Sequence, residues 1–151
     1  MRLAAAHQAG HIAMALGLGW QVRKCSITHV ELRPGHFQPL DLAMINLAGD
    51  VAVKVLFDRD FLIRGAVFHK LTHFDPELAR VIDRVRYGGA PRVAACGSYD
   101  IGAAIALLID DDPGAEPAAL IKTYRLLEID VTQVLTRRAR DLAKIANRLL
   151  H

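Results

Sequence analysis

Two histidines near the start of the chain, His7 and His11, lie four residues apart in a stretch that we expect to be helical. On a helix this spacing places both imidazoles on one face, with their Cβ atoms about 5–6 Å apart. Two imidazoles so placed can bind one transition-metal ion, at about 2.0–2.1 Å each for Zn²⁺. A bare pair of this kind is more often two ordinary residues of a helix face. The pair therefore indicates a metal site only if the neighbouring residues support one.

Gln8 follows the first histidine directly and limits what a metal there could do. In the metalloprotease signature H-E-x-x-H this position holds a Glu that acts as the general base. A neutral amide can hydrogen-bond a water molecule but cannot accept its proton. Gly10, inside the same helix, costs about 1 kcal/mol relative to Ala. Its presence suggests that another helix or the metal site comes close at this point.

The pattern of apolar residues predicts a mainly α-helical fold with a small β element. We expect helices over residues 2–16, 41–57, 76–87, 99–112 and 117–150, the last as one long helix or as two. Asp75 is the predicted N-cap of the third helix and Ser98 that of the fourth. Trp20 to Gly35 is the stretch rich enough in β-branched and aromatic residues to form strands. Residues 58–73 are ambiguous and expected to be partly helical.

The composition limits the class of protein. The 151 residues are 52% apolar with a formal net charge of +3, which predicts one folded domain over residues 1–151 and a weaker basic excess than dedicated nucleic-acid binders show. No apolar run reaches the roughly 18–20 residues that span a bilayer, and the polar residues at positions 7, 8 and 11 interrupt any signal-peptide core. Cys25 and Cys96 have no metal-binding spacing, so we expect buried thiols and a cytoplasmic protein.

The stretch AAAHQAGHIAMALGLG resembles the active-site helix of the FtsH-type ATP-dependent zinc metallopeptidases, whose signature is H-E-A-G-H. The resemblance continues in order along nearly the whole chain. KCSITHVELRPG is similar to the strand and turn after that helix, and INLAGDVAVKVLF to a glycine-containing helix of the family. GSYDIGAAIALLI is similar to the segment with the third zinc ligand, and LLEIDVTQVLTRRARDLAKIANRLL to the closing helix. The most specific parts are H-x-A-G-H and S-x-D-I.

This resemblance implies a compact zincin-like domain that binds Zn²⁺ through His7, His11 and Asp100, with a fourth position left for water. Helix electrostatics agree for Asp100, because a carboxylate is favoured in the first turn of a helix. Taken alone, Asp100 would be an ordinary carboxylate of that kind. The implied substrate is an unfolded polypeptide or peptide, and a separate ATPase or partner protein would be compatible with the resemblance.

The sequence departs from the family's pattern in three places. Gln8 stands at the general-base position, either as the natural residue of a pseudoprotease or as a deliberate Glu→Gln change, so we expect little or no hydrolysis. Val53 and Lys54 replace an acidic pair, for which Asp50 is a possible substitute. The ATPase motif G-x-x-x-x-G-K-[ST] does not occur in these 151 residues, and no stretch among them resembles the family's membrane anchor. We therefore do not expect the chain to unfold substrates by itself.

Other candidate sites are weaker. His69 and His73 repeat the four-residue spacing but have no neighbouring acid, and His29 and His36 flank the β element without a partner. The run of aspartates at residues 110–112 fits a solvated helix end better than a cation site.

Two alternatives to a zinc peptidase-like domain remain. The first is a non-catalytic pseudoprotease that binds a partner protein through its substrate groove. The second is a small nucleic-acid-binding adaptor, suggested by the basic residues of the last helix: Arg137, Arg138, Arg140, Lys144 and Arg148. Acidic residues are interspersed among them, so a solvated helix face is the simpler interpretation and we predict no nucleic-acid partner.

Overall fold

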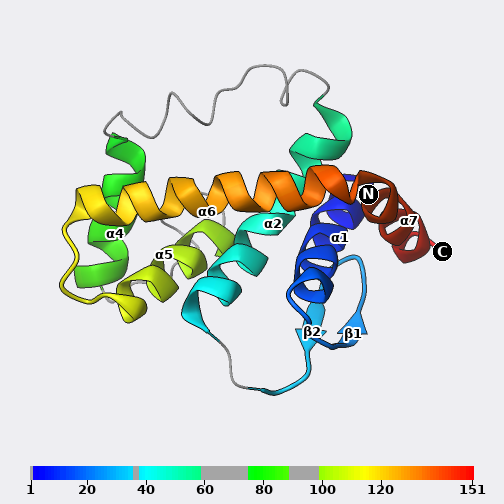
Figure 1. Ribbon diagram of the computed structural model, residues 1–151, viewed down its shortest axis with the longest axis horizontal. Helices are drawn as coiled ribbons and strands as arrows, with labels where there is room; N and C mark the ends of the chain where they lie inside the picture. The colour runs from blue at the N-terminus through cyan, green and yellow to red at the C-terminus, as the bar shows by residue number, and fades with distance from the viewer. Residues whose placement is uncertain (1, 36–37, 59–74, 89–98) are drawn as a thin grey trace.

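The computed structural model describes residues 2–35, 38–58, 75–88 and 99–151. The described residues form six α-helices and one two-stranded sheet (Figure 1). In chain order the elements are α1 (Arg2–Gly17), β1 (Val22–Cys25), β2 (Val30–Leu32), α2 (Pro39–Phe57), α4 (Pro76–Tyr87), α5 (Tyr99–Asp111), α6 (Pro117–Arg137) and α7 (Ala139–Leu149). The predicted mainly helical class with a small β element is confirmed.

Local sequence signals set several helix ends. The Asp75 carboxylate accepts hydrogen bonds from the backbone N–H groups of Glu77 and Leu78, at 3.0 and 3.2 Å, and so caps α4 as predicted. Proline begins α2, α4 and α6, where its missing N–H costs nothing. The last amphipathic stretch forms two helices, because the backbone leaves the helical region at Arg138 and α7 begins at the next residue.

Helix α2 is the central element of the fold. It packs against α1 on one side and against α5 and α6 on others, while α7 packs on α1. In Figure 1, α6 runs across the molecule and contacts α4, α5, α2 and α1 in turn. The core is aliphatic, and its largest fully buried side chains are Met14, Ile82, Ile105, Leu135, Leu142, Val81 and Val131.

The crossing of α1 and α2 is unusually close. A Cβ added at Gly10 would lie 2.2 Å from the carbonyl oxygen of Ala48 and 2.6 Å from the Cβ of Ala52. No side chain fits at such distances, so glycine is required here for the two backbones to meet. The two α2 residues opposite Gly10, Ala48 and Ala52, have small side chains and are fully buried. The approach of another helix that Gly10 suggested is therefore present.

The β element is an antiparallel hairpin that packs on α1. Its turn is fixed by Ser26, whose backbone N–H donates to the His29 carbonyl and whose Oγ accepts from the N–H groups of Thr28 and His29. Cys25 corrects one prediction, because its thiol is exposed rather than buried. The reason is that β1 belongs to a two-stranded sheet with little cover, so three of its four residues face solvent.

No helix among the described residues is long and apolar enough to cross a membrane. Some predictions fall outside the described residues. These are the partial helix over residues 59–73, the second histidine pair His69 and His73, and the placements of His36, Cys96 and Ser98.

Candidate metal centre

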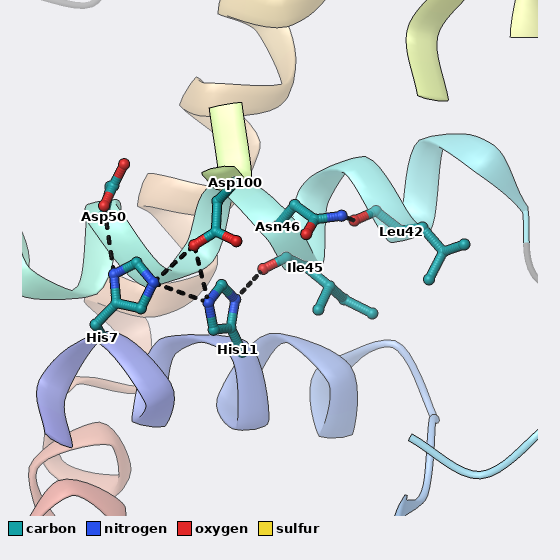
Figure 2. A network of polar contacts seen from close by, with 7 residues as sticks. All are labelled: His7, His11, Leu42, Ile45, Asn46, Asp50 and Asp100. Carbon is teal, nitrogen blue, oxygen red and sulfur yellow. Dashed lines mark hydrogen bonds and ion pairs between the residues drawn. The ribbon is translucent and has the colours of Figure 1, made fainter. Parts of the chain in front are cut away.

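Helices α1 and α5 bring together the three side chains that the sequence analysis assigned to a metal. His7 and His11 lie one turn apart on α1, and Asp100 lies in the first turn of α5. Both imidazoles and the carboxylate point into the same space, with α2 directly behind them (Figure 2). In the part of the chain that the structure describes, this is the one group of three His, Cys, Asp or Glu side chains that could hold a metal ion.

The three candidate ligand atoms lie nearly as far apart as a tetrahedral metal site requires. Asp100 Oδ2 is 2.7 Å from His7 Nε2 and 3.2 Å from His11 Nε2, and the two Nε2 atoms are 3.1 Å apart. Bonds of about 2.0–2.1 Å at tetrahedral angles separate zinc ligands by about 3.3–3.4 Å. An ion would thus need to move these side chains by only a few tenths of an ångström. The cluster could hold a metal ion.

Each imidazole is oriented by a contact at its other nitrogen. His11 Nδ1 donates to the Ile45 carbonyl oxygen at 2.6 Å, which leaves Nε2 of the neutral ring without a proton and free to bind a metal. His7 Nδ1 lies 3.3 Å from Asp50 Oδ1, so the ring also presents Nε2 to the cluster. Contacts of this kind fix the tautomer and the direction of metal-binding histidines. Asp50, the suggested substitute for the family's acidic pair, therefore lies where it can orient the His7 ring.

Gly49 is a residue of the site whose role sequence reasoning missed. A Cβ added there would lie 2.5 Å from His7 Cε1 and 2.7 Å from His11 Nε2. The two imidazoles consequently rest on bare backbone of α2, at the point where any side chain would displace them. The sequence contained a signal, because a glycine in the interior of a helix is costly and often marks a close approach.

In the absence of metal, a proton takes the place of the cation. Hydrogen bonds to Asp100 and Asp50 raise the pKa of His7 to about 9, although burial opposes the shift. Burial alone would raise the pKa of Asp100, but the contacts with His11 and His7 outweigh it and hold that pKa well below its usual range. At neutral pH a His7 cation is therefore paired with an ionised Asp100.

The cluster forms one wall of a cavity of about 370 Å³ that opens to solvent. Gln8 lines this cavity beside the two histidines, where the sequence placed the general-base position. The hairpin contributes four further lining residues, Thr28, His29, Val30 and Leu32. His29, for which the sequence suggests no partner, lines the same cavity as the metal-site candidates. No sequence spacing could indicate this, because the hairpin reaches the site only through its packing on α1.

We compared the chain with protein families, curated proteins and solved structures. No family model, no curated protein and no solved structure matches the chain. The resemblance to the FtsH-type peptidases thus rests on the sequence motifs alone.

Metal affinity should depend on pH, because the ion must displace the Nε2 proton of His7. Below the raised pKa of about 9, each unit of falling pH should weaken zinc binding about tenfold. The free energy of unfolding of the metal-free protein should change in the opposite direction. The contribution from the protonated His7 paired with Asp100 is full below pH 6.5 and is lost as pH rises through about 9. Competition titrations and urea unfolding across this range measure both. Affinity independent of pH between 6.5 and 9 would contradict the assignment of His7.

Gly49→Ala should damage metal binding while leaving the fold intact. The new methyl group displaces the ends of two side chains that can rotate away, and alanine favours the helix by about 1 kcal/mol. Zinc affinity should fall about 10- to 100-fold, the range found when groups that support metal ligands are changed. Gly114→Ala is the control, because no atom lies within 4 Å of its added Cβ. Circular dichroism reports the fold, and equal zinc affinity in both variants would show that the imidazoles do not need the bare backbone.

Proposed function

We propose that this chain is a zinc-binding, metallopeptidase-like domain that is inactive or nearly so because Gln8 stands at the position of the general base. The observation that carries the proposal is the convergence of His7 Nε2, His11 Nε2 and Asp100 Oδ2, with the other nitrogen of each ring already engaged. Three protein ligands beside a cavity that opens to solvent would match catalytic zinc sites, which keep one position open.

The donor set favours zinc among the common metals. Two imidazoles and one carboxylate suit a borderline ion better than calcium or magnesium, which prefer all-oxygen sites. Ferrous iron uses the same donor set in some oxygenases. Elemental analysis of protein purified without a histidine tag separates the two, and iron in place of zinc would overturn the peptidase proposal.

Zinc in this position would supply a Lewis acid and an activated water molecule for hydrolysis. The chain's own residues would then have to orient that water and accept its proton. Gln8 is among the residues that line the cavity, and a carboxamide can hold a water molecule by hydrogen bonds but has no basic site. Loss of a general base costs roughly 10²–10⁴-fold in rate. We therefore expect binding without efficient turnover.

The cavity suits a polypeptide segment in an extended conformation. Its walls combine apolar side chains, Val30, Leu32 and Leu42, with the polar groups of Asn46 and Thr28. An unfolded substrate could bring a peptide carbonyl to the metal while its side chains contact the apolar wall. A folded substrate would first need to be unfolded by another protein, such as a separate ATPase.

A non-catalytic role is the second candidate, and Gln8 is the observation that favours it. Zinc would then stabilise the contact between α1 and α5, and the cavity would hold a segment of a partner without cutting it. Restoring the general base distinguishes the two candidates.

Gln8→Glu should raise peptide hydrolysis by roughly 10²–10⁴-fold, because it returns a proton acceptor to the site at almost no steric cost. The assay compares the zinc-loaded protein that carries Gln8 with the zinc-loaded variant, on casein or a quenched peptide library. Gln133→Glu is the matched control, since it makes the same change at an exposed position of α6. Adding His11→Ala to Gln8→Glu should abolish the gain.

A rise that a zinc chelator removes would support a peptidase whose base is missing. If both proteins bind zinc and neither hydrolyses peptides, the peptidase proposal is contradicted. The non-catalytic, partner-binding role would then be the remaining candidate.

A further inference from the structure

A trough runs along another side of α1, between that helix, the hairpin and α7. Two adjoining cavities form it, with volumes of about 580 and 360 Å³. They share Leu16, Ile145 and Arg148, so they are parts of one continuous depression. Figure 1 shows α7 lying beside α1 at the end of the molecule that also carries the hairpin.

The floor of the trough is aliphatic. Ile12 comes from α1, Ile27 from the hairpin turn, and Ile145 and Leu149 from α7. Leu16 stands at the centre with 49% of its surface exposed. A concave apolar surface of this size on a soluble protein is typical of a binding site rather than of ordinary surface.

The rim of the trough is cationic. Arg138, Lys144 and Arg148 line it and are exposed, against the single carboxylate of Asp141. None of the three cations pairs with a carboxylate of the described residues. The Arg138 side chain lies against the C-terminal end of α1. A Cβ added at Gly17 would be 3.5 Å from its Nη1 atom. Residues 137–151 contain five Lys or Arg and one Asp, a larger positive excess than the +3 of the whole chain.

We propose that this trough docks an acidic segment of a partner protein, whose apolar side chains enter the floor and whose carboxylates pair with the rim. Charge complementarity selects an anionic partner, and the hollow aliphatic floor selects one with protruding apolar side chains. A membrane surface would not fill a depression, and a nucleic acid would gain little from an aliphatic floor without stacking partners. The proposal does not depend on the metal site.

The test uses a random peptide library displayed on phage and selected on the full chain. Selected peptides should be rich in Asp and Glu together with Leu, Ile or Phe. One such peptide, labelled and measured by fluorescence anisotropy, should bind Lys144→Glu/Arg148→Glu at least about tenfold more weakly than wild type. The matched control is Arg137→Glu/Arg140→Glu, which reverses two exposed charges nearby that do not line the trough. It should retain affinity within about twofold.

A second variant tests the floor separately. Leu16→Asn changes a half-exposed side chain, so the fold should persist, and peptide affinity should again fall about tenfold.

Several outcomes would overturn the proposal. They are selected peptides without acidic residues, equal losses in both charge-reversal pairs, and no effect of Leu16→Asn. Tighter binding to anionic lipid vesicles or duplex DNA than to the peptide would assign the trough to a different partner. A concentration-dependent dimer that Leu16→Asn abolishes in sedimentation experiments would assign it to a second copy of the chain.

Discussion

The close crossing of α1 over α2 is the constraint on which the candidate site depends. Gly10 lets the two backbones meet, and Gly49 leaves the space that the two imidazoles occupy. Because α2 also packs on α5, the same helix that supports His7 and His11 sets the distance to Asp100. The cluster is thus held by three helices whose positions the aliphatic core fixes. All three side chains lie on helices rather than loops, which would favour a preorganised metal site.

Electrostatics explain how the cluster can exist with or without an ion. The side chains of His7, His11 and Asp100 are only 25%, 11% and 17% exposed, so an uncompensated charge among them would be costly. Without metal, the proton on His7 balances Asp100. A metal ion bound by the three side chains would replace that proton. The second carboxylate, Asp50, contributes to this balance from the far side of His7. We therefore expect a proton and a metal ion to compete for this position.

Much of this arrangement was predictable from the sequence. Periodicity and capping signals gave the helices, and the three proposed ligands meet as the motifs indicated. The remainder depended on tertiary packing. No local pattern could show that Gly49 lies under both rings, that Ile45 orients His11, or that the hairpin brings His29 to the cavity. The burial predicted for Cys25 was wrong because residue type does not reveal how little covers a two-stranded sheet.

X-ray absorption at the zinc edge, on untagged protein loaded with one equivalent of zinc, would report directly which atoms bind the metal. We expect the metal to be coordinated by two imidazole nitrogens and by carboxylate or water oxygens, at distances of about 2.0–2.2 Å. A sulfur shell at about 2.3 Å would instead place the metal on the cysteines. That result, or a chain that fails to retain zinc, would contradict a metal centre formed by His7, His11 and Asp100.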